Sequence, residues 1–69
     1  MSVARVVEIS STSDKSFEDA VQQGIARATK TLRNVRSAWV KEQEVQVQEN
    51  KIVAWKVSLM VSFVLDETT

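Results

Sequence analysis

The sequence has 69 residues without cysteine or histidine, and its nine basic residues balance nine acidic ones. Disulfides and thiolate metal sites are therefore excluded, and the commonest metal ligand and general base near neutral pH is missing. The zero net charge, with basic residues that are not clustered, argues against nucleic acid as a partner. We expect one domain over 1–69. Since so small a core usually needs a partner, we also expect a homo-oligomer.

The cellular location can be predicted from the N-terminal segment MSVARVVEIS and from the length of the apolar runs. The segment is too short and too charged for a signal peptide. No apolar run approaches the ~20 residues that span a membrane. We therefore expect a cytoplasmic protein that has no membrane partner.

The first predicted elements are a strand and a helix. ARVVEIS, residues 4–10, is rich in β-branched residues and predicts a strand, and the polar SSTSDKS after it favours a turn and a helix start. In residues 16–35, Ser16 and Asp19 predict a cap, and Asn34 predicts a left-handed helix end. The apolar residues of this segment share one helical face: Phe17, Ala20, Val21, Gly24, Ile25, Ala28 and Leu32.

Gly24 is the only glycine in the chain. Inside a helix, glycine costs roughly 1 kcal/mol relative to alanine. Its place on the apolar face therefore predicts close approach to a strand or to a neighbouring helix.

Two long strands are predicted after the helix, RSAWVKEQEVQVQ (36–48) and IVAWKVSLMVSFVLDE (52–67), with a turn at ENK. In the second strand every odd position from Val53 to Leu65 is apolar, so this face, including Trp55, is expected to pack on the helix. The first strand changes phase, which predicts a bulge or bend between Val40 and Val45.

The predicted order is β-α-β-β, an α+β fold with a three-stranded antiparallel sheet partly wrapped around one helix. Such a sheet leaves two edges and one face open, which is a second reason to expect self-association.

The segments SSTSDKSFEDAVQQGIARATKTLRNV and VSFVLDE, with two long strands between, resemble the dodecin family from Ala4 to Glu67. The resemblance implies a hollow homododecamer that binds or stores small ligands. The best-known members bind flavins (riboflavin, FMN or FAD) between subunits, stacking the ring on a tryptophan and bonding its edge to a glutamine. Other members are described as binding calcium.

The alignment that this resemblance implies places the stacking tryptophan at Ser37 and the glutamine at Lys56. Serine offers no stacking surface, and lysine offers hydrogen-bond donors only. The resemblance to the family therefore implies a flavin as the ligand of this chain. The alternative is a flavin-free, calcium-type shell with an ion-binding, structural or buffering role.

The candidate ligand residues are Ser37, Trp39, Lys56 and Ser58. Trp39 is expected on the same strand face as Ser37, about 7 Å further along, either as the wall of an inter-subunit pocket or as packing across a subunit contact. Lys56 either binds an anion or pairs with a carboxylate of a neighbouring subunit.

Glu42 and Glu44 are the candidate ligands for calcium or another hard cation. No calcium-loop spacing accompanies them, so a solvated strand face is the other interpretation. The chain has no histidine, cysteine, tyrosine, glycine-rich loop or nucleophile paired with a base, so we do not expect an enzyme.

Overall fold

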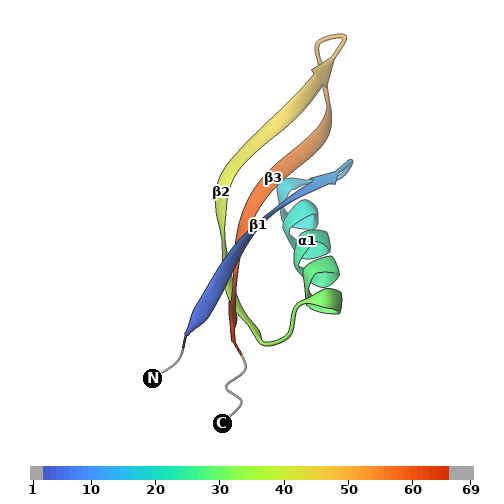
Figure 1. The fold of residues 1–69 in the computed structure, drawn as a ribbon. Coiled ribbons are helices and arrows are strands. Elements are labelled where there is room, and N and C mark those ends of the chain that lie inside the picture. The colour runs from blue at the N-terminus through green and yellow to red at the C-terminus, as the bar shows by residue number, and fades with distance from the viewer. Residues whose placement is uncertain (1–2, 66–69) are drawn as a thin grey trace.

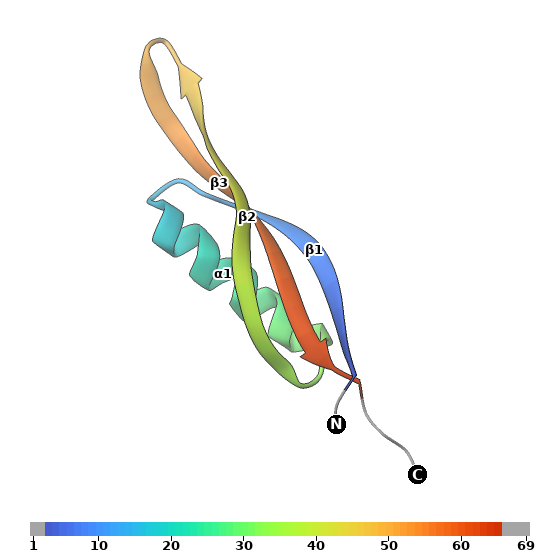
Figure 2. The same cartoon turned by 90° about the vertical axis from the view of Figure 1, so that its left-hand side faces the viewer.

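The protein is described here by a computed structural model covering residues 3–65. Its elements are β1 (Ala4–Ser13), α1 (Phe17–Thr31), β2 (Val35–Gln48) and β3 (Lys51–Val64). The strands form one antiparallel sheet in the order β1-β3-β2, with α1 against one face (Figures 1 and 2). Because β1 and β2 are both antiparallel to β3, they run parallel to each other and α1 is the crossover between them. The predicted β-α-β-β fold is confirmed.

The core lies between α1 and the central strand. Val57, Leu59 and Val61 of β3 are buried together with Ala20 of α1, which confirms the middle of the predicted core face. The two ends of that face, Val53 and Leu65, are exposed, and there the prediction was wrong. Partly buried apolar residues complete it: Val7, Ile9, Phe17, Val21, Ile25, Leu32 and Val35. Trp55 lies on the same side of β3 but is only partly buried. Its partner in β1 is Ser13, the last residue of that strand, so Trp55 lies where the three-stranded part of the sheet ends.

A hydrogen-bond network holds the start of α1. The Ser16 hydroxyl accepts a bond from the Asp19 backbone N–H (2.9 Å), as the sequence predicts for a cap. The buried Ser13 hydroxyl accepts a bond from the Lys15 N–H (2.9 Å) and donates to the Asp19 carboxylate (2.6 Å). The ionised form of Asp19 is favoured by hydrogen bonds from Ser13 and Gln23 and by the positive charge of Lys15. The bond from Ser13 contributes most to lowering the Asp19 pKa below its ordinary value of 3.8, against the opposing effect of desolvation.

The strand predicted over 4–10 is confirmed, but the turn predicted after it was wrong for residues 11–13. These residues continue β1, with pairs from Ser11–Val57 to Ser13–Trp55. Strand pairing outweighs their turn propensity because β3 runs on beside them. The predicted left-handed helix end at Asn34 was wrong, because α1 ends at Thr31 and its C-cap, Leu32, is extended (φ −101°, ψ 132°). Asn34 does take a left-handed conformation (φ 63°), but in the connection to β2.

Gly24 is the point of closest approach between α1 and the sheet. A Cβ at this position would lie 2.8 Å from Leu59 Cδ1 and 3.1 Å from Ser11 Cβ. The close approach predicted for this glycine is confirmed, and its partners are β3 and β1.

Strand β2 contains the predicted irregularity. Its pairing shifts between Val40 and Glu42, so Lys41 is an extra residue, and a second shift leaves Arg36 extra. The β2–β3 turn is closed by Glu49 and Asn50, both with positive φ (51° and 66°), as in the tight turns that match strand twist. The hairpin extends past the helix and makes the molecule long, 57 × 19 × 13 Å.

No helix within residues 3–65 is long and apolar enough to cross a membrane.

Candidate functional site

The sheet face turned away from α1 carries the candidate site, and we call it the open face. Residues that pair across antiparallel strands project to the same side, so the register defines this face in rows. From the C-terminal end of β3 towards the hairpin, the rows (β1, β3, β2) are Val6–Ser62–Ser37, Glu8–Met60–Trp39, Ser10–Ser58–Glu42 and Thr12–Lys56–Glu44.

All four predicted ligand residues lie on the open face. Ser37 and Trp39 occupy adjacent rows of β2, and Lys56 and Ser58 occupy adjacent rows of β3. The row of Lys56 lies four residues from that of Trp39, about 14 Å along the strand. The register thus forms two groups, a tryptophan end and a lysine end, with Ser58 between them.

Trp39 is the largest apolar side chain on the open face, and 52% of its surface is exposed. It pairs with Met60 at a non-terminal position of the sheet, so its backbone is fixed while its indole is accessible. An exposed indole on a rigid strand can stack a planar ligand or pack against another subunit.

Glu42 and Glu44 also lie on the open face, opposite Ser58 and Lys56 respectively. The sequence placed a partner carboxylate for Lys56 in a neighbouring subunit, whereas the register puts Glu44 directly across from Lys56 in the same chain. Within residues 3–65, no three His, Cys, Asp or Glu side chains come close enough to hold a metal ion. Calcium takes six to eight oxygens, so these two carboxylates need ligands from another copy.

An ion pair that the sequence did not predict crosses the open face. The Lys41 ammonium of β2 lies 3.3 Å from the Glu8 carboxylate of β1. The two strands flank β3 and are about 10 Å apart. The Lys41 side chain therefore extends across β3, near Met60, to reach Glu8. Both side chains are about half exposed, and such a pair contributes about 0–1 kcal/mol.

Sequence reasoning missed Lys41 because it is the extra residue of the bulge, and its direction cannot be read from alternation. It also missed Ser10 and Thr12, whose hydroxyl side chains join Ser58 and Lys56 on the open face. Only the register of β1 against β3 reveals these two residues.

Comparison with known proteins identifies the family. The family model for dodecin matches residues 3–66. The chain is 39% identical to a dodecin from Thermus thermophilus over 66 residues, 96% of either protein. It is 35% identical over 63 residues to a calcium dodecin from Mycobacterium tuberculosis, covering 91% of this chain and 89% of that protein.

Solved structures agree. A Thermus thermophilus protein superimposes with a TM-score of 0.91 at 38% identity, covering 99% of this chain and 100% of that one. A dodecin from Streptomyces davaonensis gives 0.90 at 36%, covering 96% and 97%. The Mycobacterium tuberculosis calcium dodecin, described as a calcium-chelating antigen with a calcium-binding site, gives 0.82 at 31%, covering 99% and 97%. This small β-α-β-β chain therefore belongs to the dodecin family.

Proposed function

We propose that the protein forms a homododecamer that binds and stores a small ligand on the open face of its sheet, with a flavin as that ligand. The observation that carries this proposal is the half-exposed indole of Trp39 on the open face, which also carries Ser37, Ser58 and Lys56. Binding needs only such a surface, and we assign the protein no catalytic step. Its cytoplasmic location stays a prediction.

Trp39 is the proposed stacking residue. It lies on the same face as Ser37, one row away, and its indole is half exposed. Lys56 supplies donors only and lies about 14 Å along the strand from Trp39, so within one chain it is too far from a ring stacked on Trp39 to bond to a ring carbonyl. Its proposed partner is a phosphate oxygen of the ligand.

The test is a titration of flavin-free protein into riboflavin, followed by flavin fluorescence. We expect saturable quenching. Trp39→Ala should weaken binding by about 1–3 kcal/mol, the range for loss of an aromatic stacking partner. Trp55→Phe is the matched control, since Trp55 lies on the opposite face and should leave the affinity unchanged. Absence of quenching by the parent protein would reject flavin as the ligand.

A second candidate is a calcium-type shell, supported by Glu42 and Glu44 on one face and by similarity to a calcium dodecin. A cation that binds only the folded protein stabilises it by about 2.7 kcal/mol at one hundred times its Kd. The melting temperature with calcium should then be higher than the melting temperature with a chelator. In the Glu42→Gln/Glu44→Gln double variant, the two melting temperatures should be equal. Equal melting temperatures with calcium and with chelator would exclude this candidate.

The proposed assembly is tested by light scattering on a sizing column. Twelve chains of 7.8 kDa have a mass of about 94 kDa (12 × 7.8). A monomer at micromolar concentration would contradict the proposed assembly.

A further inference from the structure

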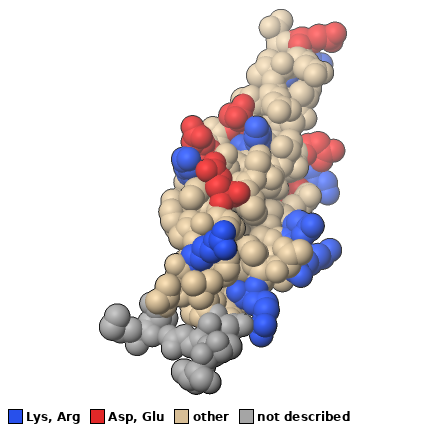
Figure 3. Space-filling view, viewed as in Figure 1, with Lys and Arg blue, Asp and Glu red and all other residues tan. Residues whose placement is uncertain are grey.

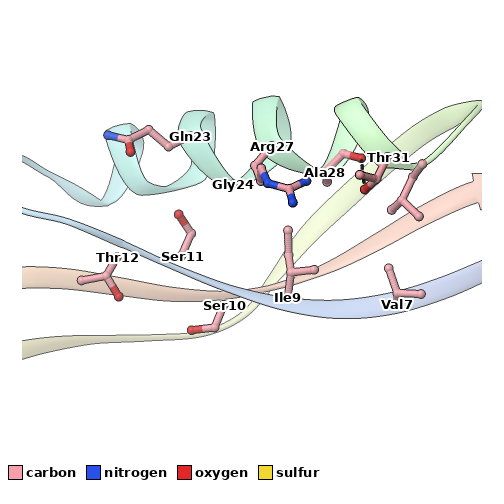
Figure 4. Close-up of a pocket in the computed structure, with 11 residues that line it drawn as sticks. Val7, Ile9, Ser10, Ser11, Thr12, Gln23, Gly24, Arg27, Ala28 and Thr31 are labelled. Atoms are coloured by element: carbon pink, nitrogen blue, oxygen red, sulfur yellow. Dashed lines mark hydrogen bonds between the residues drawn. The ribbon is translucent and has the colours of Figure 1, made fainter.

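A groove of about 610 Å³ lies between α1 and the edge strand β1, on the side of the sheet opposite the open face. Its volume is in the range of small-molecule sites in proteins. Strand β1 forms one wall with Val7, Ile9 and Ser11, since alternate residues of a strand project to the same side. Figure 4 shows these three side chains pointing towards the helix, whereas Ser10 and Thr12 point away from it.

The groove is divided along its length into an apolar half and a polar half. The apolar half lies towards the C-terminal end of α1 and is lined by Val7, Ile9, Ala28 and Leu32. Thr31 also lies at this end, but its hydroxyl donates to the Ala28 carbonyl (3.5 Å) and is therefore used within the helix. The polar half lies towards the N-terminal end of α1, where Ser11 and Gln23 line the two walls. A ligand with one apolar end and one polar end matches this division.

Arg27 supplies the charge of the groove. Of the residues within 3–65 that line it, only Arg27 is charged. Arg27 lies one helical turn from both Gln23 and Thr31, so it is placed where the polar and apolar halves meet. Figure 4 shows its side chain pointing from the helix towards β1. In the same described part of the chain, no carboxylate pairs with the Arg27 guanidinium and no group bonds to the Ser11 hydroxyl. These donors are therefore available to a ligand.

The surroundings of Arg27 are also positively charged. Residues 20–36, which include most of α1, contain four basic side chains and no acidic one. Figure 3 shows blue atoms gathered towards the lower part of the helix. The preceding acidic residue of α1, Asp19, lies about 12 Å from Arg27 along the helix axis, and its carboxylate already accepts hydrogen bonds from two side chains. Glu8, the single acidic residue of β1, lies on the open face. An anion in the groove is therefore attracted to Arg27 without a competing carboxylate from either wall.

We propose that the groove between α1 and β1 is a second binding site, which takes a small amphipathic carboxylate. The carboxylate pairs with Arg27, and the apolar body of the ligand lies along Ile9 and Leu32. A planar guanidinium donates two parallel hydrogen bonds to the two oxygens of a carboxylate. One guanidinium also balances a single negative charge, whereas a phosphate group carries about two. The inference goes beyond the proposed function, because it concerns the side of the sheet opposite Trp39 and Lys56.

Calorimetric titration of the full-length, flavin-free protein with octanoate tests this proposal. We expect saturable binding with a Kd below about 1 mM, which a ligand of this size can reach. Acetate has the charge without the apolar body, and octanol has the body without the charge. Each should bind more weakly than octanoate by a factor of about ten or more. From butyrate to octanoate, the affinity should rise by up to about fourfold per methylene group, the gain for full burial.

Two arginine variants locate the site. Arg27→Gln removes the charge but keeps a polar side chain at an exposed position, so circular dichroism should show an unchanged fold. Octanoate should bind this variant more weakly by a factor of about ten or more, with an affinity similar to that of octanol. The matched control is Arg36→Gln, which loses the same charge but lines the smaller groove between α1 and β2. It should bind octanoate as the parent protein does.

Each of four outcomes would overturn the inference. Equal binding of octanoate and octanol to the parent protein would mean that no charge is recognised. A larger loss in Arg36→Gln than in Arg27→Gln would place the ligand in the other groove. Loss of octanoate binding in Trp39→Ala would place it on the open face. Absence of octanoate binding would reject the site.

The proposed function is judged separately from this site. Octanoate binding without quenching of riboflavin would reject only the flavin. Quenching of riboflavin without octanoate binding would reject only the groove between α1 and β1.

Discussion

Gly24→Ala tests the closest contact in the fold. The added methyl group would lie 2.8 Å from Leu59 Cδ1 and 3.1 Å from Ser11 Cβ. Leu59 is 1% exposed at the centre of the core, so its side chain has little room to turn aside. The Ser11 Cβ is bonded directly to the backbone of β1 and moves only with that strand. The helix must therefore shift away from the sheet.

Two effects of opposite sign set the magnitude. Replacing glycine by alanine inside a helix stabilises the helix by about 1 kcal/mol. Forcing a methyl group into a packed core costs about 1–3 kcal/mol. Because two neighbours are struck at once, we place the packing cost in the upper half of that range and expect a net loss of about 1–2 kcal/mol in the free energy of unfolding.

Urea denaturation at a fixed protein concentration measures this loss. The matched control is Ala26→Gly on the exposed side of the same helix, which should cost about 1 kcal/mol and so measures the helix-propensity effect alone. The double variant Gly24→Ala/Leu59→Val shortens the side chain that the new methyl group would contact. Its loss in the free energy of unfolding should be smaller than the sum of the losses of the two single variants. If Gly24→Ala stabilises the protein by about 1 kcal/mol, as propensity alone requires, the steric reasoning is wrong.

Two further predictions concern the start of α1. Ser16→Ala removes the side-chain acceptor for the Asp19 N–H and should lower stability by about 1 kcal/mol in the same urea assay, whereas an unchanged midpoint would deny the cap a role. The Asp19 carboxylate has a lowered pKa because Ser13 donates to it, so the folded state binds its proton less tightly than the unfolded state. This stability is present above the ordinary value of 3.8 and is lost as pH falls through the lower folded pKa. Asp19→Asn should flatten thermal stability against pH in that acid range, and an unchanged slope would contradict the assignment.

Much of the fold could be predicted because its physical causes are local. The alternation in β3 places Val57, Leu59 and Val61 on one face, and burial of that face requires the helix. The single glycine marks the closest approach of helix and strands. The phase change in β2 requires an extra residue, although alternation cannot say that this residue is Lys41.

The parts that could not be predicted depend on register between distant segments. Residues 11–13 have turn-forming side chains, and only pairing with β3 makes them strand. The Lys41–Glu8 pair joins strands 33 residues apart, across a third strand. For the candidate site, alternation correctly placed Ser37 and Trp39 together, but the distance between Trp39 and Lys56 required the pairing of β2 with β3.

The strand order has a consequence for how the chain is made. Since β3 lies between β1 and β2, a nascent chain that has reached Gln48 holds two strands that do not pair with each other. No ladder can form until β3 is synthesised and inserted between them, with Ala4 then joined to Val64. The pairing of β3 with β2 is a local hairpin, but its pairing with β1 joins distant segments and is slow, and the apolar face of α1 stays uncovered until β3 is in place. We therefore expect a chain whose translation stops before β3 not to fold, so the topology would restrict the proposed assembly to chains that contain all three strands.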